Sequence, residues 1–219
     1  MGKTNLFTPE QTIILDQVEK DPYLRSNFYF TGGTALSYLY LKHRHSEDLD
    51  FFSVKELDKE RILSLITKWA NQLDFTFEAQ MKEVVYIFLL TFKNGTTLKV
   101  DFGYYPYPRV EKGGKYKRLE VDSLRDIAIN KLVTVNQRTT AKDFVDLYFL
   151  LEHFTLWDLM YGAEKKFKME FDPLILTGDL LDKAEQLESL PKMIKPLTLD
   201  ELKTFYTEKA KEIAKESLE

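Results

Sequence analysis

Residues 28–52 of this 219-residue chain, FYFTGGTALSYLYLKHRHSEDLDFF, contain the features that decide its fold. The apolar residues of 27–31 predict a short strand, which two consecutive glycines, Gly32 and Gly33, end in a turn. A helix is expected to begin near Thr34, and the alternation of acidic and apolar residues that closes the stretch predicts a second strand. The order is therefore strand, glycine turn, helix, strand.

The second of these strands carries two acidic residues, Asp48 and Asp50, separated by one apolar residue. Alternate side chains of a strand share a face, so both carboxylates are expected to point the same way. A third acid, Asp101, lies on the polar face of another expected strand, 96–102. Three carboxylates on polar strand faces suit Mg²⁺, which prefers oxygen ligands and usually keeps waters and phosphate oxygens around it. The alternative is that these acids are solvated strand positions without a ligand.

The glycine pair stands where a strand gives way to a helix. Glycines let the backbone approach a ligand closely, and the N–H groups at a helix start favour an anion such as a triphosphate. A glycine pair by itself more often marks just a turn. Because this pair precedes the acidic strand, it would place a cradle for phosphates where metal-bridged phosphates need one.

The hydrophobic periodicity of the chain changes near Val121. Before that point the patterns predict further helices at 9–20 and 62–73 and strands at 75–79, 84–92 and 96–102. The last two strands are joined by Asn94-Gly95, the favoured pair for a type I′ hairpin turn. After Val121 helix starts follow near Ser123, Thr140, Asp172 and Thr198. We predict an α+β fold with a mixed sheet in 1–121 and a helical bundle in 122–219.

The composition fits an ordinary globular protein with 44% hydrophobic residues and a net charge of −4. The absence of cysteine excludes disulfides, thiolate metal sites and cysteine nucleophiles. The longest apolar run, 84–90, is too short to cross a bilayer, and the polar start of the chain has no signal segment. A cytoplasmic protein without a membrane partner is expected.

One segment, 104–118, is basic in an otherwise acidic chain, with a local charge of +4. Basic residues beside aromatic rings can neutralise phosphates and stack on unpaired bases, so the segment is a candidate RNA-binding surface. Gly113 and Gly114 predict a flexible loop, and the alternative is a solvated hairpin. The candidate RNA-binding residues are Tyr104, Tyr105, Tyr107, Arg109, Lys112, Lys115, Lys117 and Arg118.

Several of these stretches together resemble a known family. Residues 32–36 and 43–52 resemble the signature of the AbiEii/AbiGii toxin family of nucleotidyltransferases, relatives of the polymerase-beta-like superfamily. Segments 126–132 and 138–147 are similar to that family's lysine helix and Asp-x-x-Asp helix. The resemblance implies a polymerase-beta-like core, NTP as substrate, and two Mg²⁺ ions as cofactors. The residues that it implies as metal ligands and catalytic groups are Asp48, Asp50 and Asp101. The nucleotide-binding residues that it implies are Gly32, Gly33 and Thr34, which would contact the phosphates, and Lys131, Asp143 and Asp146.

The resemblance also implies a function, transfer of a nucleoside monophosphate from an NTP to an acceptor. RNA, with tRNA favoured, is the implied acceptor, and a toxin role with a cognate antitoxin or in phage defence is implied as well. Two alternatives stay open: transfer to a hydroxyl of a small molecule or protein, and a catalytically silent binding module. For single residues, Lys131 has the alternative of an exposed helix lysine, and Asp146 that of a surface ion pair with Lys142.

Overall fold

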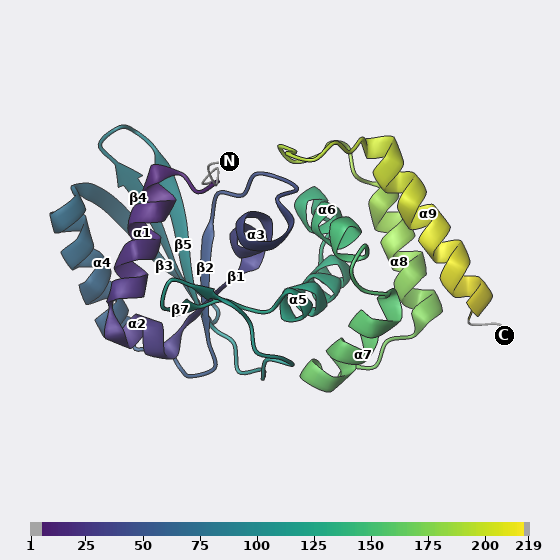
Figure 1. The fold of residues 1–219 in the computed structure, drawn as a ribbon, viewed down its shortest axis with the longest axis horizontal. Helices are drawn as coiled ribbons and strands as arrows, with labels where there is room; N and C mark the ends of the chain where they lie inside the picture. The colour runs from purple at the N-terminus through teal and green to yellow at the C-terminus, as the bar shows by residue number, and fades with distance from the viewer. Residues whose placement is uncertain (1–5, 217–219) are drawn as a thin grey trace. The chain divides into compact units, whose positions relative to one another are not determined.

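The structure is a computed structural model that describes residues 6–216. The chain divides into two compact units (Figure 1). The first unit contains the chain up to Tyr40 together with Ser46–Pro108 and Lys112–Ser123. The second contains Leu41–His45, Arg109–Glu111 and the chain from Leu124 on. Each unit therefore takes residues from both sides of the change in periodicity.

A five-stranded sheet forms the centre of the first unit, in the strand order β1-β2-β5-β4-β3. The strands are β1 (Tyr29–Thr31), β2 (Leu49–Ser53), β3 (Phe75–Lys82), β4 (Val85–Phe92) and β5 (Thr97–Tyr104). β2 and β5 run parallel, whereas the other neighbouring pairs are antiparallel. The sheet is therefore mixed, and the predicted α+β class is confirmed.

Helices cover both faces of this sheet (Figure 1). One face carries α1 (Pro9–Lys20), α2 (Pro22–Asn27) and α4 (Lys59–Leu73), and the other carries α3 (Gly32–Ala35), which continues into the π-helix η1 (Leu36–Leu41). Toward α1 and α4 the sheet is apolar, with Phe51 and Phe102 fully buried and their rings stacked 5.3 Å apart. Because strand side chains alternate, their neighbours Asp50 and Asp101 lie on the opposite face, beside α3.

The predicted helix at 9–20 is confirmed, and its first turn explains why it starts there. Thr8 caps the helix, and Gln11 completes a capping box with Pro9 at the first helical position. The short helix α2 was not predicted, although Asp21 caps it and Pro22 occupies its first position. It takes up residues that precede β1, which begins at Tyr29 instead of residue 27.

The turn between β4 and β5 differs from the predicted type I′ turn. That type needs positive φ at both central residues, and of Asn94 and Gly95 only Gly95 has it, at +80°. The Asn94 side chain instead accepts a hydrogen bond from the Thr96 N–H at 2.9 Å, which holds Asn94 outside the left-handed region. The result is a three-residue loop ending in a left-handed glycine, closed by the Phe92 N–H on the Thr96 carbonyl.

Part of the segment after β5, residues 115–120, forms a second small hairpin where a loop was predicted. β6 (Lys115–Tyr116) pairs antiparallel with β7 (Leu119–Glu120), and Val121 bridges to Phe30 of the main sheet. A Cβ on Gly113 would lie 1.9 Å from the Val121 carbonyl oxygen. This glycine therefore permits a backbone approach too close for any residue with a side chain.

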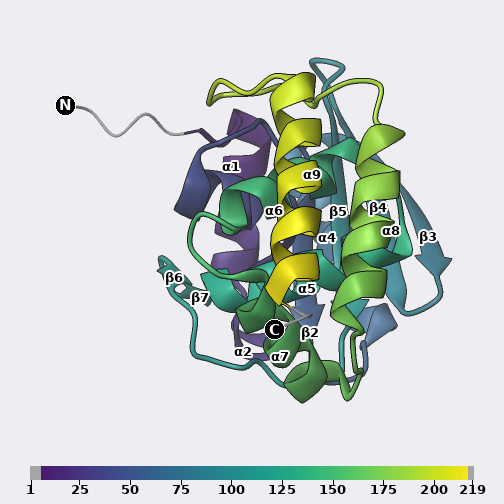
Figure 2. The same ribbon diagram turned by 90° about the vertical axis from the view of Figure 1, so that its right-hand side faces the viewer.

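The second unit is a helical bundle, as predicted. Its helices are α5 (Leu124–Gln137), α6 (Ala141–Leu150), α7 (Leu156–Phe167), α8 (Pro173–Glu185) and α9 (Leu199–Glu216). Figure 2 shows α8 and α9 side by side, and the Tyr206 hydroxyl of α9 donates to the Phe144 carbonyl of α6 at 2.8 Å. α7 was not predicted. Within residues 6–216 no helix is long and apolar enough to cross a membrane.

Candidate functional site

The three acids singled out in the sequence come from neighbouring strands of the first unit. β2 and β5 are parallel neighbours, and their register pairs Asp50 with Asp101. Asp48 precedes the first residue of β2, Leu49, and is half-buried like Asp50. The fully buried Leu49 separates the two, so the expected alternation of buried apolar and accessible acidic positions is present.

A lysine stands among these carboxylates. Lys99 lies two residues before Asp101 on the same face of β5, and its Nζ donates a short hydrogen bond to Asp101 Oδ2. Burial by itself lowers the pKa of Lys99, but the hydrogen bond and charge of Asp101 raise it above its ordinary value. The charges of Asp48 and Asp50 act in the same direction. All three acids are therefore close enough to the Lys99 ammonium to stabilise its charge.

The donor set at this place suits Mg²⁺, because the three acids supply carboxylate oxygens and already surround a cationic group. As the side chains stand in residues 6–216, no group of three or more acids and histidines is arranged to hold a metal ion. Asp101 directs one carboxylate oxygen at Lys99 instead. A metal ion here would therefore have to share or take over the position of the Lys99 ammonium.

The glycine turn packs directly against the acidic strand. Gly32 has φ +74°, and a Cβ built on it would lie 2.0 Å from Asp50 Oδ2. No other residue type can bring the backbone this close to the carboxylate, because any side chain would collide with it. α3 begins at Gly32 itself, two residues earlier than predicted. Gly33 continues its first turn, so both glycines lie at the helix start beside Asp50.

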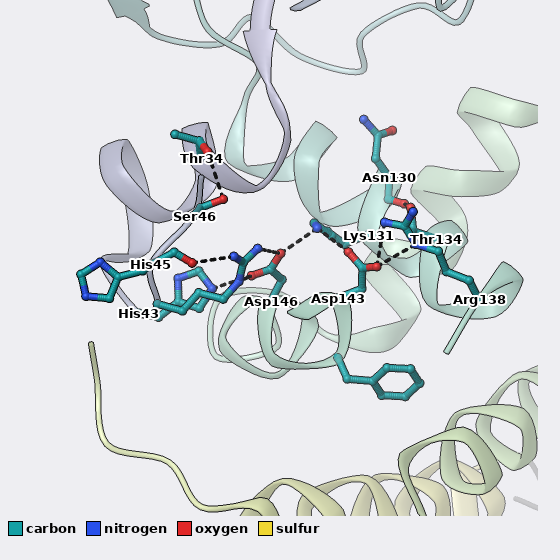
Figure 3. A network of polar contacts seen from close by, with 12 residues as sticks. Thr34, His43, His45, Ser46, Asn130, Lys131, Thr134, Arg138, Asp143 and Asp146 are labelled. Carbon is teal, nitrogen blue, oxygen red and sulfur yellow. Dashed lines mark hydrogen bonds and ion pairs between the residues drawn. The ribbon is translucent and has the colours of Figure 1, made fainter. Parts of the chain in front are cut away.

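Thr34 is fully buried and serves to hold the chain that leads into the acidic strand. Its hydroxyl makes a short hydrogen bond to the Asp48 carbonyl and lies 3.0 Å from Ser46 Oγ (Figure 3). Two residues not identified from the sequence help: Gln11 donates to the Ser46 carbonyl at 3.0 Å, and Tyr38 donates to the same oxygen at 2.9 Å. The backbone leading to Asp48 is therefore fixed from three elements.

The second unit contains a buried cluster of charges centred on two aspartates of α6 (Figure 3). Asp146 accepts two hydrogen bonds from Arg44, from Nε at 2.7 Å and Nη2 at 2.8 Å. The Lys131 Nζ of α5 lies 2.6 Å from Asp143 Oδ1 and 2.7 Å from Asp146 Oδ2. Arg138 donates to Asp143 Oδ2 at 2.8 Å. Two anions and three cations thus share one network of hydrogen-bonded ion pairs.

The environment of this cluster sets its charge states. Burial alone would raise the pKa of Asp146, but the charges of Lys131 and Arg44 hold it far below its ordinary range. Burial lowers the pKa of His43 by more than the neighbouring Asp146 raises it, so this imidazole is neutral at neutral pH. His43 Nε2 lies 2.7 Å from Asp146 Oδ1, where the neutral ring donates its hydrogen to the carboxylate. Asp146 therefore stays ionised.

Two alternatives considered for these residues are wrong. Lys131 is only 9% exposed and is not a surface lysine, and Asp146 is completely buried, which excludes a surface ion pair with Lys142. Sequence reasoning missed Arg44 and His43, which lie outside any predicted element. The signal available was their position inside the family-like stretch 43–52.

The candidate RNA-binding residues are divided between the two units, and some of their charges are paired. Lys117 and Arg118 pair with Asp16 and Glu19 of α1, which offsets two of the five positive charges. Arg109 belongs to the second unit with Val110 and Glu111, whose backbone N–H groups donate to the buried Asp126 of α5. The exposed residues of the predicted set in the first unit are Tyr107, Lys112, Lys115, Lys117 and Arg118.

The tyrosines of this segment differ in accessibility. The Tyr105 ring stacks on Phe52 at 4.9 Å and contacts Tyr107 at 5.0 Å, and Tyr104 is half-buried at the end of β5. Tyr107 is 39% exposed. Tyr107, which also packs on Tyr105, is therefore the tyrosine of this set with the most surface for a stacking base.

Comparison with known proteins relates most of the chain to one family. The sequence model described as "Nucleotidyl transferase AbiEii toxin, Type IV TA system" matches residues 13–216. Protein aq_aa25 of Aquifex aeolicus is 33% identical over 193 residues, covering 85% of this chain and 88% of that protein. A solved structure from Helicobacter pylori, described as a candidate nucleotidyltransferase, is 25% identical with a TM-score of 0.55 and 93% of both chains covered. The nucleotidyltransferase toxin MenT4 of Mycobacterium tuberculosis, at 15% identity, TM-score 0.52 and coverage of 92% and 82%, shares the fold.

Proposed function

This chain belongs to the AbiEii nucleotidyl transferase toxin family and is a nucleotidyltransferase. We propose that its acceptor is RNA and that its reaction depends on Mg²⁺. The nucleoside monophosphate of an NTP passes to the acceptor, and pyrophosphate leaves. tRNA is the RNA that the family resemblance favours. A toxin role with a cognate antitoxin partner, and a cytoplasmic location where NTPs and RNA are found, complete the proposal and rest on the family alone.

The observation that carries the proposal is the gathering of three carboxylates on one sheet face, around a cationic group. Asp50 and Asp101 are register partners on adjacent parallel strands, and Asp48 precedes the same strand as Asp50. These three residues would hold the metal. The chemistry that two Mg²⁺ ions supply in such a site is activation of the attacking hydroxyl and neutralisation of the leaving pyrophosphate. A binding module without catalytic activity would not need three carboxylates gathered at one place.

The proposed nucleotide-binding residues have different kinds of support. Gly32 and Gly33 present backbone at the start of a helix immediately beside Asp50, which suits phosphates near the metal ligands. Thr34 contributes by holding the Asp48 carbonyl. For Lys131, Asp143 and Asp146 the support is the family motif, together with a network that orients the Lys131 ammonium between the two carboxylates.

The proposed function is tested by incubating the protein with each of the four NTPs labelled at the α-phosphate, in the presence of Mg²⁺. Total cellular RNA is offered in one series, and a protein-free metabolite extract and a protein extract in two others. We expect label on RNA, with one NTP preferred. Label on a small molecule or a protein would instead support the alternative acceptors.

Gly32→Ala is expected to abolish transfer. The new Cβ would overlap the Asp50 carboxylate, so the carboxylate must move, and positive φ adds a cost of about 1–2 kcal/mol. The measurement is transfer of the α-label to RNA, together with thermal unfolding. Gly95→Ala is the matched control, because Gly95 also has positive φ but a Cβ there meets open space. Gly95→Ala should lose stability and keep its activity; equal activity of the two variants would contradict the role given to Gly32.

Changing Lys112 and Lys115 together to Ala is expected to raise the apparent KM for RNA and leave NTP binding unchanged. Both are exposed in the segment that follows β5, the strand that carries Asp101. If each contacts a phosphate, the slope of RNA affinity against salt should fall by about two units. This slope is measured by titrating the protein with RNA at several salt concentrations. The double variant Lys59→Ala/Lys68→Ala removes the same charge from the exposed face of α4 and should change neither quantity.

An unchanged KM and salt slope in the Lys112/Lys115 variant would remove this segment from the proposal. An acceptor without a phosphate backbone, such as a small molecule or a protein, would then be favoured over RNA. The single variant Tyr107→Ala refines the test, since loss of a stacking ring costs up to about 1–3 kcal/mol of RNA binding with little salt dependence.

A further inference from the structure

The register of the two central strands places Lys99 at a defined position among the acids. β2 and β5 pair Leu49 with Val100 and Asp50 with Asp101. Continuing this parallel register by one residue brings Asp48 level with Lys99. The four polar side chains on this face therefore form two adjacent rows, Asp48 beside Lys99 and Asp50 beside Asp101. Three corners of the square are carboxylates and the fourth is an ammonium.

The contacts agree with this placement. Lys99 Nζ is hydrogen-bonded to Asp101 Oδ2, and Asp101 itself is 8% exposed. Lys99 is 37% exposed at its side chain, so solvent reaches the ammonium from one side. Three carboxylates this close to one another repel unless a cation lies between them. In the protein without metal that cation is Lys99.

We propose that Lys99 is the resident counter-ion of the acidic site and that a divalent metal ion must displace it in order to bind Asp48, Asp50 and Asp101. The proposal rests on the metal site put forward under the proposed function and adds a residue to it. Lys99 stabilises the metal-free protein by offsetting the carboxylate repulsion. By the same interaction it opposes metal entry, because its ion pair with Asp101 is lost when the metal binds. The ammonium released in this way stays near the site on a flexible stem.

An ordinary surface ion pair would have neither effect, and the chain contains a suitable comparison. Lys93 also pairs with an aspartate of the first unit, Asp74, but both partners are largely exposed, at 74% and 67%. Asp74 ends α4, and Lys93 lies in the loop after β4. Lys93→Met is thus the matched control for Lys99→Met, since each removes one lysine charge from one Asp.

The experiment measures Mn²⁺ binding by electron paramagnetic resonance, and thermal unfolding in chelator and in saturating Mn²⁺. We expect Lys99→Met to bind Mn²⁺ about tenfold more tightly than the wild type, since an adjoining positive charge has gone. Without metal it should unfold at a lower temperature than Lys93→Met, and saturating Mn²⁺ should close that difference. Lys99→Arg, which keeps the charge, should bind Mn²⁺ as weakly as the wild type. Lys99→Gln replaces Lys99→Met if the latter does not fold.

Two results would overturn the proposal in distinguishable ways. If the wild type binds Mn²⁺ and Lys99→Met binds it with the same affinity, Lys99 is an ordinary ion pair and the metal site stands. If neither protein binds Mn²⁺, the proposed metal site fails together with the displacement of Lys99. If Lys99→Met and Lys99→Arg both bound Mn²⁺ more tightly than the wild type, the proposal would also be wrong, because the charge of Lys99 would then not be what opposes metal binding.

Discussion

Asp50→Asn is expected to reduce nucleotidyl transfer by at least about a thousandfold, because a lost metal ligand forfeits several kcal/mol of transition-state stabilisation. The fold should survive, since Asn has the same shape and one of the mutually repelling charges has gone. Asp48→Asn should have the same consequence. Asp50 lies in β2 beside Gly32 and in register with Asp101, so its loss affects the centre of the proposed site. Initial rates of α-label transfer to RNA measure the effect.

Glu47→Gln is the matched control for these variants. Glu47 is exposed, precedes Asp48 directly, and contributes its backbone carbonyl, not its carboxylate, to the hydrogen bond with Gln11. It should transfer at close to the wild-type rate. A second readout separates chemistry from folding: Mg²⁺ should raise the unfolding temperature of the wild type and hardly that of Asp50→Asn. Wild-type transfer by Asp50→Asn would show that the metal-site assignment is wrong.

Asp146→Asn is expected to destabilise the second unit by about 3–5 kcal/mol, the usual cost of removing one partner from a buried ion pair. Asp146 is fully buried and accepts hydrogen bonds from Arg44 and His43 while pairing with Lys131. An amide keeps the shape but leaves the cations with one compensating carboxylate, Asp143. The measurement is urea unfolding at neutral pH, where the lowered pKa of Asp146 keeps the wild-type side chain ionised.

The comparison variant for Asp146→Asn is Glu212→Gln on α9. Glu212 pairs with Lys209 at 2.6 Å on the surface, and removing such a pair costs about 0–1 kcal/mol. An unfolding midpoint for Asp146→Asn equal to that of Glu212→Gln would mean that the buried network contributes no more than a surface pair. The expectation that this buried network stabilises the second unit would then be wrong.

Local rules predicted those parts of the fold that depend on neighbours along the chain. The helix predicted from Pro9 is α1, and the capping box of Thr198 and Glu201 predicted the start of α9. α7 was missed even though Thr155 and Asp158 form the same kind of box. Its box has Asp in place of the usual Glu or Gln, and the preceding helix ends only a few residues earlier, so the signal was weak.

The acids of the candidate site could be selected from the sequence, but their surroundings could not. Lys99 resembles any strand lysine until the β2–β5 register puts it beside Asp48. The local charge of +4 in 104–118 does not reveal that Lys117 and Arg118 are offset by acids of α1, about a hundred residues earlier. Arg44 is buried against the usual tendency of charged residues, because Asp146 compensates its charge in space. Such partners follow from tertiary structure alone.

The central claim is that the protein transfers the nucleotidyl group of an NTP, and the position of the phosphate label tests it most directly. The protein is incubated with total RNA and Mg²⁺, once with NTP labelled at the α-phosphate and once with the same NTP labelled at the γ-phosphate. We expect the α-label to appear on RNA and the γ-label to leave as pyrophosphate, with neither on RNA in Asp50→Asn or in excess chelator. Transfer of the γ-label to RNA, or α-label transfer that Asp50→Asn retains in full, would contradict the account.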